Sequence, residues 1–135
     1  MVFLNNFVFL IGGSNPTCKA LKTVEKYNIK KKQWLPAGQL HVGVNNPTTC
    51  VFKNRYILSC CGMNEFDFIS NRFEVYDSIN DGWSILKTAV NLQQKAINFL
   101  NGGSAVVINS DVIYVFGGTR STDFQHDTDF GILLN

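Results

Sequence analysis

A repeat of about 49 residues constrains the fold of this chain more than any other feature of its sequence. Displacing the chain by 49 places residues 1–7 (MVFLNNF) on residues 50–56 (CVFKNRY) without a gap. The same displacement aligns Gly13 with Gly62, Glu25 with Glu74, Tyr27 with Tyr76 and Trp34 with Trp83. A third copy begins at residues 105–118 (AVVINSDVIYVFGG). Repetition at this period indicates several copies of one supersecondary unit that stack on one another.

Each copy has the pattern of short β-strands. In the first copy, the apolar runs Val2–Leu4 and Phe7–Ile11 flank Asn5-Asn6, a pair that tolerates the positive φ of a tight hairpin turn. A third strand is predicted at Thr23–Asn28 and a short fourth one at 33–35. Strands are predicted at 49–52, 56–60, 72–77 and 82–86 in the second copy, and at 105–108 and 112–116 in the third. Four antiparallel strands in about 50 residues make one blade of a β-propeller.

The spacing of glycine and aromatic residues resembles the kelch motif. Gly12-Gly13 is followed after fourteen residues by Tyr27 and after seven more by Trp34, and the second copy keeps both spacings. In that copy Cys61 replaces the first glycine of the pair. The resemblance implies an all-β fold, a partial kelch β-propeller of about 2.8 four-stranded antiparallel blades, with both end blades incomplete.

We expect one kelch-repeat segment over 1–135, with blade 1 at 1–38, blade 2 at 45–87 and an incomplete blade 3 at 103–135. Because kelch propellers most often have six blades, the segment is predicted to be a fragment of a longer propeller. Open blade faces and unpaired edges favour aggregation. The faces are expected to meet the remaining blades of a longer chain, with self-association into a two-chain ring as the alternative.

The residues that recur in every copy are predicted to be structural, because a ring has many blades but one central site. These positions are Gly12, Gly13, Tyr27, Trp34, Gly62, Tyr76, Trp83, Gly117 and Gly118. The glycines are expected where φ is positive or where a side chain would clash. The aromatic residues are expected to fill the space between adjacent blades.

Composition excludes several classes of protein. The chain is 45% apolar and 16% charged with a net charge of +2, which favours a globular core and argues against a strongly basic nucleic-acid binder. No apolar run approaches the ~20 residues of a membrane span. The four cysteines form no C-x-x-C pair, so neither a disulfide framework nor a metal site is predicted, and a reducing, cytoplasmic location is expected.

Two cysteine predictions can be tested against a structure. Cys60 and Cys61 are neighbours on one predicted strand, so their side chains should point to opposite faces and should not chelate one metal together. The thiol of Cys18 lies next to Lys19, which leaves a reactive thiol as an alternative to a buried one. No cofactor is predicted.

The resemblance implies that partners bind at the loops after each glycine pair and at the connections between blades. The positions of this chain that match those loops of the family are Ser14, Asn15, His41, Asn45, Asn46, Met63, Asn64, Thr119 and Arg120. The connection at 87–103 is seven residues longer than its counterpart and places Phe99 and Leu100 at helical spacing with Leu92 and Ala96. This connection is predicted either to cover the central channel of the propeller or to present Phe99 and Leu100 to a partner.

The function predicted from these features is a non-enzymatic protein–protein interaction module that presents inter-strand loops to a protein partner. Kelch propellers commonly act as substrate receptors or cytoskeletal adaptors within larger proteins. The alternative is a fragment of a propeller enzyme, either copper oxidase-like or sialic-acid-processing. The oxidase type needs two histidines and two tyrosines near the axis, and this chain offers only His41 and His126 as histidines.

Overall fold

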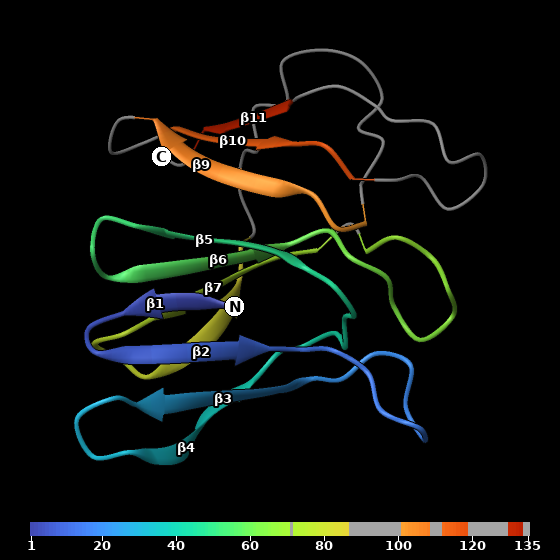
Figure 1. Ribbon diagram of the computed structural model, residues 1–135. Coiled ribbons are helices and arrows are strands. Elements are labelled where there is room, and N and C mark those ends of the chain that lie inside the picture. The colour runs from blue at the N-terminus through green and yellow to red at the C-terminus, as the bar shows by residue number, and fades with distance from the viewer. Residues whose placement is uncertain (71, 87–100, 109–111, 119–129, 134–135) are drawn as a thin grey trace.

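The computed structural model describes residues 1–70, 72–86, 101–108, 112–118 and 130–133, and these form three antiparallel sheets (Figure 1). Sheet 1 contains β1 (Val2–Leu4), β2 (Phe7–Ile11), β3 (Thr23–Asn28) and β4 (Gln33–Gln39) in that order. Sheet 2 contains β5 (Thr48–Phe52), β6 (Tyr56–Cys60), β7 (Phe73–Asp77) and β8 (Gly82–Ile85). Sheet 3 contains β9 (Ser104–Ile108), β10 (Val112–Phe116) and β11 (Phe130–Leu133), with β10 in the middle. The all-β prediction is confirmed.

Most predicted strands agree with the observed ones to within one residue at each end. The fourth strand of sheet 1 is the exception, because it continues to Gln39 instead of stopping at residue 35. Its pairing with β3 shifts register between Thr23 and Glu25. This longer strand carries Ala37 into the core between sheets 1 and 2.

The first hairpins of sheets 1 and 2 differ by one residue in the turn. In sheet 1, Leu4 pairs with Phe7 across the two-residue turn that was predicted. In sheet 2, Phe52 pairs with Tyr56, so three residues, 53–55, separate the strands. The gap-free alignment of the two copies is therefore wrong by one residue in the first strand.

The reason for the difference is the lysine at position 53. The gap-free register would give Lys53 the place of Leu4, a side chain that is 4% exposed in the core. A slip of one residue exchanges the two faces of a strand, and here it buries Phe52 and leaves Lys53 in the turn with a φ of 52°. Burying the ammonium group of Lys53 among apolar side chains would cost far more than one extra turn residue.

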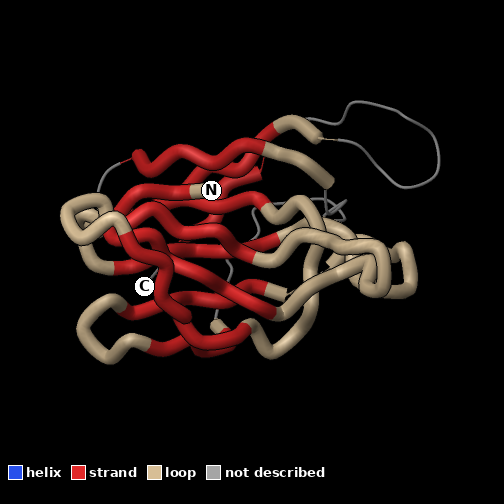
Figure 2. The backbone as a smooth tube through the Cα atoms, turned by 60° about the horizontal axis from the view of Figure 1, so that its bottom comes forward, coloured by secondary structure: helices blue, strands red, loops and turns tan. Residues whose placement is uncertain are grey.

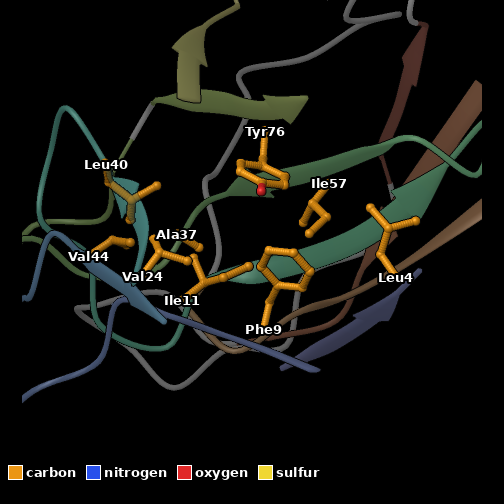
Figure 3. Close-up of a cluster of buried hydrophobic side chains, with 9 residues drawn as sticks. All are labelled: Leu4, Phe9, Ile11, Val24, Ala37, Leu40, Val44, Ile57 and Tyr76. Carbon is orange, nitrogen blue, oxygen red and sulfur yellow. The ribbon is translucent and has the colours of Figure 1, made fainter. Parts of the chain in front are cut away.

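The three sheets are stacked as layers, with sheet 2 between sheets 1 and 3 (Figure 1). Equivalent strands lie over one another, because β1 contacts β5, β5 contacts β9 and β4 contacts β8. The core between sheets 1 and 2 comprises Leu4, Phe9, Ile11, Val24, Ala37, Leu40, Val44, Ile57 and Tyr76 (Figure 3). The core between sheets 2 and 3 comprises Cys50, Phe52, Leu58, Cys60, Cys61, Phe73, Ile113 and Val115.

Within the described residues, sheets 1 and 3 are each packed against another sheet on one face only. Their outer faces carry exposed apolar side chains. On sheet 1 the exposed side chains include Phe3 (58%), Trp34 (50%) and Leu10 (37%). On sheet 3 they are Val106 (45%), Ile108 (46%), Tyr114 (41%) and Phe116 (40%). Sheet 2, which is covered on both sides, shows no comparable apolar face within the described residues.

The prediction that Cys60 and Cys61 point to opposite faces is wrong. β6 ends at Cys60, and Cys61 adopts a left-handed backbone conformation with a φ of 60°. Because this conformation breaks the alternation of an extended strand, both thiols enter the core between sheets 2 and 3, where Cys50 also lies. The four cysteines are free thiols.

Several predictions fall outside the described residues. These concern the insertion with Phe99 and Leu100 and the loop residues Thr119 and Arg120. In the part of the chain that is described, no helix is long and apolar enough to cross a membrane.

Candidate functional site

The loops after β2 and β6 leave their sheets at the same end, where the β4–β5 connection also runs (Figure 1). Figure 2 shows long loops gathered at one end of the strands. The β4–β5 connection, residues 40–47, is hydrogen-bonded to both loops. The N–H of Gly13 donates to the carbonyl of Val44 at 2.8 Å. Asn45 and Met63 exchange backbone hydrogen bonds at 2.7 and 2.9 Å. The three segments therefore form one connected surface.

Close approach of the segments requires glycine at two positions. A Cβ at Gly12 would lie 2.2 Å from the carbonyl oxygen of Val44, and φ there is 63°. A Cβ at Gly62 would lie 2.7 Å from the carbonyl oxygen of Asn45, and φ is 77°. Any side chain at either position would push the connection away from its loop.

Asn15 and Asn64 occupy the same repeat position and shape their loops in the same way. The Asn15 Oδ1 accepts hydrogen bonds from the N–H groups of Thr17 at 3.0 Å and Cys18 at 2.7 Å. The Asn64 Oδ1 accepts from the N–H groups of Phe66 at 2.9 Å and Phe68 at 3.1 Å. These Asx turns use the carbonyl oxygen of two residues that were predicted to contact a partner.

A buried carboxylate holds the backbone of the connection. Glu74 is 3% exposed, and its carboxylate accepts hydrogen bonds from the N–H groups of His41 at 2.9 Å and Val42 at 3.1 Å. The same carboxylate contacts His41 Nδ1 at 2.8 Å. Glu25, at the same repeat position in sheet 1, is exposed. The connection at residues 41–42 is thus fixed by an acceptor from β7.

A cavity of about 210 Å³ lies between the loops and the connection. It is lined by Ala20, Lys22, His41, Val42, Gly43, Asn64, Glu65 and Phe66. Of the predicted site residues, His41 and Asn64 come together there, while Ser14, Asn15, Asn45, Asn46 and Met63 lie outside its lining. Lys22, His41 and Glu65 give the cavity polar groups that can donate and accept hydrogen bonds.

Phe66 lines this cavity, and Phe68 lies two residues further along the same loop; neither was predicted as a site residue. Phe66 and Phe68 are 69% and 68% exposed, and the Asn64 turn fixes the backbone of both. An ion pair between Lys19 and Asp67 joins their loop to the loop after β2. The sequence feature that could have predicted these exposed side chains is the segment 64–68, in which two phenylalanines alternate with polar residues in a loop.

The surroundings of Cys50 and Cys60 disfavour the reactive thiolate form. Burial raises the pKa of the Cys50 thiol to about 12, and a hydrogen bond to Cys61 together with burial raises the pKa of Cys60. The Cys18 thiol donates to the carbonyl of Ala20, and the neighbouring lysine pairs with Asp67 instead. Among the described residues, no group of three or more His, Cys, Asp or Glu side chains could hold a metal ion.

The recurring aromatic residues have different surroundings in the two complete sheets. Tyr76 is 1% exposed and its ring lies 5.1 Å from that of Phe9, across the core between sheets 1 and 2 (Figure 3). The Trp83 Nε1 donates to the carbonyl of Ala37 at 2.9 Å. Tyr27 and Trp34 pack on each other with ring centroids 5.1 Å apart, on the outer face of sheet 1. Position in the repeat therefore does not by itself decide burial.

Comparison with protein families finds a match in the first part of the chain. The family model described as the Kelch motif matches residues 1–40, which span sheet 1 with its loops and the start of the connection. No curated protein matches the chain. The four-stranded antiparallel sheet, the glycine pair and the Tyr–Trp spacing agree with this match, and residues 1–40 are a Kelch motif.

Proposed function

We propose that this chain is a non-catalytic protein–protein interaction module whose partner binds at the loop surface around the cavity. The observation that carries the proposal is the pair Phe66 and Phe68, two large apolar side chains held in solvent by a rigid turn. Exposed aromatic side chains next to a cavity are typical anchors of protein interfaces.

The surroundings of the two phenylalanines support the same role. Polar groups of Lys22, His41 and Glu65 line the cavity beside Phe66, which is the arrangement of an apolar centre with a polar rim. The loops are held by Asx turns, glycine contacts and the Glu74 carboxylate, so that little conformational entropy is lost on binding. Three of the four free thiols are buried, which favours a reducing cytoplasmic location in this proposal.

The experiment compares partner capture by three forms of the full chain. The wild type, the double variant Phe66→Ser/Phe68→Ser and the control Ile79→Ser are used as bait. Ile79 is 71% exposed but lies in the turn between β7 and β8, away from the loop surface. A partner recovered with the wild type is purified, and its affinity for each form is measured by calorimetry.

The double variant is expected to bind at least tenfold more weakly, since loss of anchor residues typically costs 2 kcal/mol or more. The control should bind like the wild type. Equal binding by all three forms would overturn the assignment of this surface.

A further inference from the structure

The two faces of sheet 2 make different contacts, and this difference can be used to classify the faces of the other sheets. One face carries Ile57, Tyr76 and Trp83 and packs on sheet 1; we call it the aromatic face. The other carries Leu58 and Phe73 and packs on sheet 3; we call it the opposite face. Cross-strand pairing places Ile57, Tyr76 and Trp83 in one row, and residues in such a row share a face.

The same row identifies the outer face of sheet 1. Val8 pairs with Tyr27, and Tyr27 pairs with Trp34, which are the repeat positions of Ile57, Tyr76 and Trp83. Phe3 pairs with Val8 and extends this row into β1. The outer face of sheet 1 is therefore its aromatic face. Its opposite face, with Phe9, is the one that sheet 2 covers.

Sheet 3 is exposed on the other kind of face. Ile113 occupies the repeat position of Ile57, and Val115 lies two residues further along β10, on the same face. Both side chains are fully buried against sheet 2. This side of sheet 3 is therefore its aromatic face. The residues that alternate with these buried ones point outward: Val106, Ile108, Tyr114 and Phe116, all 40–46% exposed. These form the opposite face of sheet 3.

Both internal contacts thus join the opposite face of one sheet to the aromatic face of the next. Among the described residues, one face of each kind has no sheet packed against it. We propose that the outer face of sheet 3 binds the outer face of sheet 1 in a second copy of this chain, head to tail. The stacking of β1, β5 and β9 predicts that Val106 and Ile108 of β9 pack on Phe3 of the second copy.

Two such contacts between two copies would use every outer face. The resulting ring would contain six sheets, which lies within the range of about 4–8 found for propellers. A head-to-tail contact either closes into a ring or continues as an open filament, and six sheets make closure on two copies the expected state. Occupation of the faces by further sheets of a longer polypeptide is the competing arrangement.

The test uses one variant to block each face. Phe3→Lys places a charge on the aromatic face of sheet 1, and Ile108→Lys places one on the opposite face of sheet 3. Ile79→Lys is the matched control, because this exposed apolar residue lies on neither face. The mass and self-association of the full 135-residue chain are measured by analytical ultracentrifugation, and circular dichroism verifies that each variant is folded.

The wild type and the control should have the mass of two copies at tens of micromolar. Each blocked variant alone should dissociate, with self-association weakened about tenfold or more. An equimolar mixture of Phe3→Lys and Ile108→Lys should recover a two-copy species, because each supplies the face that the other lacks. This complementation also excludes misfolding as the cause of dissociation.

Two results would overturn the proposal. A wild-type chain that stays monomeric would indicate that other sheets cover these faces. A blocked variant that still pairs with itself would indicate contact between like faces. Neither result depends on the loop surface, so the proposed partner-binding function is tested separately.

Discussion

Sheets 1 and 2 have the same topology and the same Tyr–Trp pair, yet they place that pair in different environments. Tyr76 is 1% exposed beneath sheet 1, and Trp83 donates a hydrogen bond to a carbonyl of that sheet. Trp34, at the repeat position of Trp83, is 50% exposed on an outer face. The repeat therefore fixes which face the Tyr and Trp side chains occupy, whereas the neighbouring sheet determines how much each of them stabilises the fold.

The tyrosine pair should show the largest difference between the two sheets. Tyr76→Ala is expected to lower the free energy of unfolding by about 3–5 kcal/mol, because a fully buried aromatic side chain is lost. Tyr27→Ala should cost about 1 kcal/mol. Urea denaturation in the Ile108→Lys background, which keeps copies apart, measures both. Equal costs would show that the two positions are equivalent and that the packing described for sheet 2 is wrong.

The loss of stability on substitution should also be larger for the tryptophan of sheet 2 than for that of sheet 1, but by a smaller margin than for the tyrosines. Trp83 is only partly buried, so Trp83→Ala should cost about 2–3 kcal/mol, including the hydrogen bond to Ala37. Trp34→Ala should cost under about 1 kcal/mol in the same monomeric background. As a check on exposure, acrylamide should quench the fluorescence of Trp34 in Trp83→Phe more strongly than that of Trp83 in Trp34→Phe. Stronger quenching of Trp83 would contradict the assignment of the outer face.

The glutamate pair extends the comparison to the loop surface. Glu74→Ala should cost about 1–3 kcal/mol, because the N–H groups of His41 and Val42 lose their acceptor. Glu25→Ala, at the exposed equivalent position, should change stability by less than about 0.5 kcal/mol. Hydrogen exchange at residues 41 and 42 should accelerate in Glu74→Ala alone. Unchanged exchange there would show that the carboxylate does not hold the connection.

Much of this difference between sheets could not be predicted from the sequence. Short apolar runs and the Asn5-Asn6 turn signal were sufficient to predict the first hairpin, because these depend on local preferences. The one-residue slip at Lys53 depends on what a buried position tolerates, which only the packed sheet reveals. Cys61 is a different case: its residue type gives no sign of a left-handed conformation, but its alignment with Gly12, where φ is 63°, does.

The candidate site was predicted only in part, for a related reason. The cavity brings His41 and Asn64 together as the loop positions implied, but Phe66 and Phe68 were overlooked. Aromatic residues are more often buried than exposed, so a phenylalanine in a loop is normally assigned to a core. Their exposure follows from the Asn64 turn, which forms through a side chain and leaves no apolar periodicity in the sequence.

The last difference concerns a turn at the other end of the two sheets. In sheet 2 the Arg55 guanidinium donates to both carboxylate oxygens of Asp77, from Nε at 2.8 Å and from Nη2 at 2.6 Å. This hydrogen-bonded pair lowers the pKa of Asp77 from 3.8 to about 2. Sheet 1 has Asn6 and Asn28 at the two repeat positions and forms no such pair.

Because the folded-state pKa of Asp77 is depressed, its contribution to stability is present above about pH 4 and is lost as pH falls toward 2. The Tm of the wild type should therefore exceed that of Asp77→Asn at pH 7, and the two should converge by pH 2. The effect should be the smallest of the series, since the pair is partly exposed to solvent. Asn28→Asp is the control: it adds a carboxylate at the same position without an arginine and should give no comparable gain in Tm at pH 7. A Tm difference for Asp77→Asn that persists unchanged at pH 2 would show that the turn depends on the shape of the side chain and not on its charge.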